Sequence, residues 1–197
     1  MTLTKVKRFT RDEYRRLTEL GFFSEGDRLE LIEGEILEIA AKGTLHETCL
    51  RRLLRELPKL IGEKATWQCQ SPIALSNTSE PEPDFAILQN REDDYLNSHP
   101  TPGDTLLIIE VSDLTLNYDK KVKLPLYAAA GVADYWIFNL VDVLLETYRQ
   151  PYRINSGKFD YRYQETFLPN EAIALPNFPD SFLDLARVFP PTNSPTN

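Results

Sequence analysis

Two acidic residues border short apolar runs in the middle of the chain. Asp84 precedes the run 85–88, and Glu110 ends the run 106–109. An ionised carboxylate beside aliphatic side chains is costly to bury unless a cation or several hydrogen-bond donors meet it. Lysines follow a short way downstream, at positions 120, 121 and 123. Two acids at strand ends with a lysine beyond them are the groups that a metal-dependent phosphodiesterase needs, and the sequence favours this hypothesis.

Each acid also has a simpler explanation. Glu110 can mark the point at which a strand reaches solvent. Asp84 can belong to an acidic loop with Glu80 and Glu82, because Pro-Asp is a common turn pair. The pairing of Asp84 with Glu110, each bordering a buried strand, is what favours one shared site over two surface carboxylates.

A third acid and one lysine extend the candidate site. Glu30 has a leucine on either side, so it can point inward as a further acid or lie at the surface. Lys123 stands four residues after Asp119 and four before Tyr127, which puts the three on one helical face. The alternative is an intrahelical pair of Asp119 and Lys123, worth about a few tenths of a kcal/mol.

Other catalytic arrangements find little support. His46 and His99 fit capping or surface histidines better than ligands, and no Ser/His/Asp or Cys/His site is recognisable. Cys49 and Cys69 have neither metal-ligand spacing nor a disulfide framework, so buried free thiols are expected. The chain also lacks the GxxxxGK[ST] and GxGxxG loops of nucleotide-binding folds.

The composition is that of a globular protein with one core. With 197 residues, 42% hydrophobic and 26% charged, we expect a single domain over 1–189 and a flexible tail over 190–197. No run is long enough to span a bilayer and the start is charged, which predicts a cytoplasmic protein without membrane contact. The net charge of −8 weighs against nucleic-acid binding. Basic residues nevertheless gather at 5–16, 51–59 and 120–123, which can form a local positive face.

Apolar periodicity predicts a layered fold of helices and strands. Helices are expected over 10–21, 46–61 and 119–130, the last either starting late or kinked at Pro125 and closed by Gly131. A turn at Glu33-Gly34 predicts a β-hairpin over 28–39. Further strands are expected at 66–75 (an edge strand, because of Pro72), 84–88, 105–111, 135–138, 143–148 and 158–167. Helices between strands of mixed pairing predict an α/β or α+β fold.

Several short motifs, taken in order, resemble the Uma-two family of restriction endonucleases. These motifs are Glu30 to Glu35, His46, Pro83-Asp84, Glu110-Val111-Ser112, Asp119 with Lys123 and Tyr127, and Gly131 to Ile137. The resemblance covers residues from about 9 to 189, and the ordered set is specific although each motif alone is weak. It implies membership of the PD-(D/E)XK nuclease superfamily, with a restriction-endonuclease-like core in which helices flank a mixed central β-sheet, and with β-hairpin additions.

The resemblance also implies roles for the acids. Asp84 matches the first acid of the family motif and Glu110 the second, both expected to bind Mg²⁺ or, in its place, Mn²⁺. Glu30 matches a supporting upstream acid. Mg²⁺ prefers oxygen ligands, which suits two carboxylates and a backbone carbonyl such as that of Val111. The implied reaction is hydrolysis of DNA phosphodiester bonds.

Ser112 departs from the superfamily pattern, which has a lysine two residues after the second acid. Strand alternation puts Ser112 on the same face as Glu110, but a hydroxyl cannot replace a lysine's charge there. Similar proteins draw the lysine from the following helix, and Lys123 matches that position. Lys120 and Lys121 are poorer matches.

Two other functions stay open at this point. The chain can be a catalytically inactive module that keeps a nuclease fold for binding nucleic acid or protein, as the acidic net charge and Ser112 suggest. It can also be an acid-rich metal-binding protein with another substrate. For a nuclease that cuts both strands a homodimer is one expectation, with the aromatic segments around Tyr135 or Tyr161 as interface or as monomer core.

Overall fold

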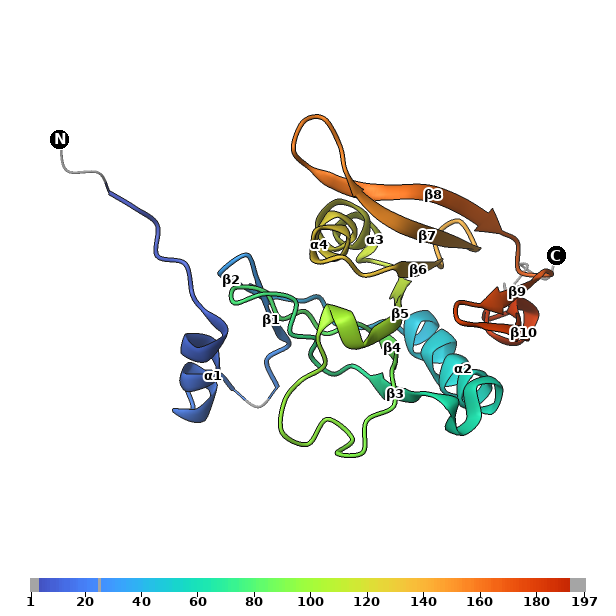
Figure 1. Ribbon diagram of the computed structural model, residues 1–197, viewed down its shortest axis with the longest axis horizontal. Coiled ribbons are helices and arrows are strands. Elements are labelled where there is room, and N and C mark those ends of the chain that lie inside the picture. Colours follow the sequence, from blue (N-terminus) through green and yellow to red (C-terminus); the bar gives the residue numbers. More distant parts are fainter. Residues whose placement is uncertain (1–3, 25, 192–197) are drawn as a thin grey trace.

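A six-stranded mixed sheet forms the centre of the protein. The computed structural model describes residues 4–24 and 26–191 (Figure 1). In this part of the chain the strand order is β3-β4-β5-β6-β7-β8, and all neighbours pair antiparallel except β5 and β6, which are parallel. The strands are β3 (Thr66–Cys69), β4 (Phe85–Leu88), β5 (Thr105–Ser112), β6 (Asp134–Asn139), β7 (Leu144–Arg153) and β8 (Phe159–Phe167). The predicted fold class is confirmed.

Helices cover both faces of this sheet. On one face lies α2 (Thr44–Ile61), whose apolar residues recur at three and four so that Leu53 and Leu57 meet Phe85 and Trp136 of the sheet. The other face is covered by the connection between β5 and β6, whose Tyr127 packs beside sheet residues. That connection consists of α3 (Leu116–Tyr118), a π-helical turn η3 (Asp119–Lys123) and α4 (Leu124–Ala130).

The connection crosses the sheet because β5 and β6 are parallel, and parallel neighbours cannot be joined by a tight turn. Pro125 falls in the first turn of α4, directly after η3, where its missing N–H and fixed φ are tolerated. Gly131 ends α4 in the left-handed region at φ 83°, as predicted. The π turn just before the proline sets which way the η3 side chains face.

A hairpin and a short helix stand beside the sheet at the amino-terminal end. The hairpin pairs β1 (Leu29–Ile32) with β2 (Glu35–Glu38), and its turn has positive φ at both Glu33 and Gly34. Helix α1 (Arg11–Glu19), within the range predicted for the first helix, starts with a capping box between Thr10 and Glu13. In Figure 1, α1 lies away from the central sheet, beyond the hairpin.

Two parts of the sheet region differ from the sequence-based expectation. The strand expected over 66–75 is an edge strand but ends at Cys69, because Gln70 has φ 48° and turns the chain. A hairpin of β9 (Ala172–Leu175) and β10 (Phe178–Asp184) was not predicted, since its register shifts and its apolar residues do not alternate cleanly. Short 3₁₀ turns are η1 (Gly62–Lys64), η2 (Pro102–Asp104) and η4 (Leu185–Arg187).

The predicted tail over 190–197 lies outside the described residues from position 192 onward. The single domain over 1–189 stays a prediction. Within the described residues, none of the helices has the length and apolar character needed to cross a bilayer.

Candidate active site

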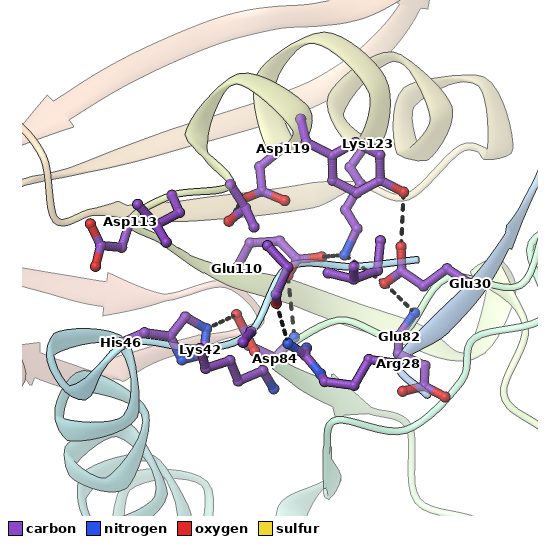
Figure 2. Close-up of a pocket in the computed structure, with 17 residues that line it drawn as sticks. Arg28, Glu30, Lys42, His46, Glu82, Asp84, Glu110, Asp113, Asp119 and Lys123 are labelled. Atoms are coloured by element: carbon purple, nitrogen blue, oxygen red, sulfur yellow. Dashed lines mark hydrogen bonds and ion pairs between the residues drawn. The ribbon is translucent and has the colours of Figure 1, made fainter. Parts of the chain in front are cut away.

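Asp84 and Glu110 lie side by side although 26 residues separate them in the chain. The antiparallel register pairs Phe85 with Ile109, which places Asp84 across from Glu110 at the end of β4 and β5. The main-chain N–H of Asp84 donates to Oε2 of Glu110 at 3.3 Å. The N–H of Val111 donates to Oδ2 of Asp84 at 3.0 Å. Both acids line one pocket (Figure 2).

Lys123 reaches this pair from η3 on the neighbouring crossover. Its Nζ lies 2.8 Å from Oε1 of Glu110 and 2.9 Å from Oε1 of Glu30, so the ammonium bridges two buried acids. Tyr127 donates its hydroxyl to the same Glu110 oxygen at 3.0 Å, and Tyr118 donates to Oε2 of Glu30 at 2.9 Å. The lysine is therefore held by strand β5 and hairpin strand β1 at once.

Asp84 is held by donors from the opposite side of the pocket. His46 Nε2 lies 2.8 Å from Oδ2, while Lys42 Nζ at 3.3 Å and Gln70 Nε2 at 3.1 Å meet Oδ1. Burial by itself raises the pKa of the Asp84 carboxyl, but His46, Lys42 and the Val111 N–H outweigh it and keep that pKa below its usual value. Asp84 is thus an ionised carboxylate in a nearly closed environment.

Ser112 occupies the place where the superfamily pattern has a lysine, on the same face as Glu110. Its hydroxyl donates to Oδ2 of Asp119 at 2.7 Å, and the hydroxyl of Thr115 donates to the same oxygen at 2.7 Å. Burial raises the pKa of Asp119 despite these donors and the nearby Lys123. Ser112 therefore anchors the start of the crossover that carries Lys123.

Carboxylates outnumber cationic side chains around the pocket. Burial, with Asp119, Asp84 and Glu30 close by, raises the pKa of Glu110 well above its usual value, although Lys123 counteracts the shift. Burial opposes the charge on Lys123, yet Glu110, Glu30 and Asp119 outweigh it and raise the lysine pKa. The lining acids are Glu30, Glu82, Asp84, Glu110, Asp113 and Asp119, against the bases Arg28, Lys42 and Lys123.

This surplus of negative charge fits a divalent cation. Among the described residues, no three His, Cys, Asp or Glu side chains already stand together as a metal-ligand cluster. The oxygen donors of Asp84 and Glu110 are nevertheless of the type that a hard cation such as Mg²⁺ prefers. The ammonium groups of Lys42 and Lys123 now supply the positive charge next to these two carboxylates.

The family model Uma2, described as "Putative restriction endonuclease", matches residues 11–186. The chain belongs to this family. A similar fold is seen in a crystal structure from Anabaena variabilis ATCC 29413 described as a putative nuclease belonging to DUF820, with a TM-score of 0.68 and 15% identity. The match covers 92% of this chain and 97% of that one, so the two share a fold. Among curated proteins, none matches the chain.

The structure of this Uma2 protein brings together the residues that the sequence singled out, namely Glu30, Asp84, Glu110, Val111 and Lys123. Glu30 is 3% exposed, which excludes the surface position. Lys123 forms ion pairs with Glu30 and Glu110. Among the described residues it forms none with Asp119, so the intrahelical pair considered for Lys123 is not formed. Of the other lysines, Lys120 pairs with Glu146 and Lys121 is exposed.

Three side chains that contact Asp84, those of His46, Lys42 and Gln70, received no role in the site from the sequence. His46 was expected as a cap or surface residue, and this was wrong: Gly43 is the N-cap of α2, and His46 is buried against Asp84. Its signal was its place on the apolar stripe of α2, three residues before Cys49. Lys42 has no comparable signal, because it lies in an irregular segment between β2 and α2.

Proposed function

We propose that this Uma2 protein is a divalent-metal-dependent endonuclease that hydrolyses phosphodiester bonds in DNA. Asp84, Glu110 and the main-chain carbonyl of Val111 would hold Mg²⁺, for which Mn²⁺ can substitute. Lys123 is the catalytic lysine and Glu30 its supporting acid. A cytoplasmic location, and a homodimer where both strands are cut, belong to the same proposal.

The observation that carries the proposal is the direct contact of Asp84 with Glu110 beside the Lys123 ammonium. Two carboxylates joined through main-chain amides, with a lysine 2.8 Å from one of them, form a compact set for binding and cleaving a phosphodiester. Family membership adds support, since the matching family model is described as "Putative restriction endonuclease". The surplus of carboxylates over basic side chains around the pocket is the charge balance expected of a divalent-cation site.

The side chains of the site divide the work. Asp84, Glu110 and the Val111 carbonyl would hold a divalent ion, which would supply a bound water of lowered pKa and polarisation of the scissile phosphoryl group. The ammonium of Lys123 can orient the attacking water or stabilise negative charge on the phosphate oxygens. Glu30 and Glu110 hold that ammonium from two sides, and Tyr127 fixes the Glu110 oxygen that Lys123 contacts. His46 fixes the orientation of the Asp84 carboxylate.

Plasmid cleavage tests this proposal. We expect the wild-type protein to nick or linearise DNA with Mg²⁺ or Mn²⁺ and to lose this activity in a chelator. Asp84→Asn and Glu110→Gln, which keep the side-chain shape, should abolish cleavage, as should alanine at either position. Asp180→Asn, a matched change at an exposed position of β10, should cleave like the wild type. Full activity in either active-site variant would reject the assignment.

A binding module without catalysis is the competing function. It is favoured by the net charge of −8 and by the protein donors that meet every oxygen of Asp84 and Glu110. Calorimetric titration with Mg²⁺ alongside the cleavage assay separates the possibilities. An enzyme shows metal binding and turnover, a metal-binding protein with another substrate shows binding alone, and an inactive module shows no turnover even where DNA binds.

A further inference from the structure

An irregular segment crosses the front of the pocket. Residues 39–43, here called the strap, connect β2 to α2 and line the pocket together with the acids (Figure 2). Two side-chain contacts hold it: Arg28 donates to the carbonyl of Ala40, and Lys42 pairs with Asp84. Within the described residues, no main-chain N–H from Ala40 to Gly43 donates a hydrogen bond. A segment held by so few main-chain bonds can move without breaking a helix or a sheet.

Lys42 brings the strap's positive charge into the site. Its Nζ lies 3.3 Å from Oδ1 of Asp84, and its side chain is only 16% exposed. Asp84 Oδ1 otherwise accepts only the neutral amide of Gln70 among the described residues. Lys42 is therefore the cation that balances Asp84 at the oxygen that a divalent ion would also use.

A divalent ion and the Lys42 ammonium cannot both keep this position, because like charges at such short range repel strongly in a partly buried site. Lys42 has a flexible four-carbon side chain, and it lies at the mouth of the pocket on a loosely held segment. Once displaced from Asp84, the partly exposed Lys42 ammonium needs another anionic partner beside the site. In a nucleic-acid substrate, the anionic group that can pair with this ammonium is a backbone phosphodiester.

We infer that Lys42 exchanges partners during function: it holds Asp84 in the metal-free protein and binds a backbone phosphate of the substrate once a divalent ion occupies the site. This inference rests on the proposed function. It assigns Lys42 to substrate binding and makes DNA binding dependent on metal. Lys42 would thus contact substrate while Lys123 stays with Glu110 and Glu30.

Two measurements on Lys42→Gln test this exchange, and Lys158→Gln, the same change at an exposed position remote from the pocket, is the matched control. In calorimetry with Mn²⁺ alone, Lys42→Gln should bind the ion about fivefold to tenfold more tightly than the wild type, because a competing ammonium is gone. Lys158→Gln should match the wild type. Equal or weaker Mn²⁺ binding by Lys42→Gln would overturn the inference.

The second measurement is binding of labelled duplex DNA by fluorescence anisotropy, with Ca²⁺ replacing Mg²⁺ and a gel to check that the DNA stays intact. Lys42→Gln should bind DNA more weakly, and its plot of log affinity against log salt should lose about 0.9 of slope, the value of one phosphate contact. Unchanged DNA affinity and slope would overturn the phosphate role. If the wild-type protein binds no Mn²⁺ at all, the proposed function itself fails, which is a distinguishable result.

Discussion

Replacement of Lys123 by methionine removes the positive charge between two buried acids while keeping the length of the side chain. In the wild type the Lys123 ammonium lies 2.9 Å from Glu30 and 2.8 Å from Glu110. In the variant both carboxylates lose this shared partner. Both acids are 3% exposed, so water cannot replace the lost partner. Breaking a buried ion pair in this way costs about 3–5 kcal/mol of folding free energy.

The cost has an upper bound that depends on pH. A carboxylate left without its partner can take up a proton, and for an ordinary glutamate pKa of about 4.3 this costs about 3.7 kcal/mol at pH 7 and about 1 kcal/mol at pH 5. The folded variant then holds a proton that the unfolded chain has released, so its stability falls as pH rises above about 4. The loss should therefore be larger at pH 7 than at pH 5.

Urea denaturation of wild type and Lys123→Met at pH 5 and pH 7 measures this difference. The expected loss is about 3–4 kcal/mol at pH 7 and about 1 kcal/mol at pH 5. The double variant Lys123→Met with Glu110→Gln should recover part of the loss at pH 7, because one of the stranded charges is gone.

Lys59→Met is the control, since the Lys59 side chain is 61% exposed and its partner Glu56 keeps a second ion pair with Arg55. It should lose less than about 1 kcal/mol at either pH. A loss for Lys123→Met below about 1 kcal/mol at pH 7, or one that is equal at pH 5 and pH 7, would refute the buried bridge between Glu30 and Glu110.

Two further predictions concern the buried Asp84 and the half-buried Asp134. His46→Ala removes a donor from the Asp84 carboxylate and should cost about 2 kcal/mol in urea denaturation at pH 7, whereas His99→Ala, in an exposed loop, should cost almost nothing. Burial raises the pKa of Asp134 to about 6 despite Arg149, so its ionisation lowers stability as pH rises from about 4 through 6. Asp134→Asn should therefore raise the melting temperature at pH 7 and leave it unchanged at pH 4. The gain at pH 7 corresponds to about 1 kcal/mol of folding free energy after discounting for solvent screening. An equal rise at both pH values would contradict this reasoning.

The sequence by itself determined most of the elements, though not the hairpin of β9 and β10, and it identified the main acids. Apolar residues at three and four fixed α2, short apolar runs fixed β4 and β5, and the positive φ required at Gly34 fixed the first hairpin. These features follow from local periodicity, which needs no knowledge of distant residues. The same local signals placed Asp84 and Glu110 at strand ends, and the expected mixed sheet is confirmed.

The tertiary structure decided which side chains meet. Strand β5 carries no lysine, so the sequence leaves the lysines at 120, 121 and 123 as candidates. Which of them reaches Glu110 depends on the π turn of η3 and on how the crossover packs, and neither leaves a periodic trace in the sequence. The contacts of His46 and Lys42 with Asp84 join residues about 40 apart, through a helix start and an irregular strap. Such pairings follow from the packing of whole elements, since burial forces each charged group to find a partner wherever the fold puts one.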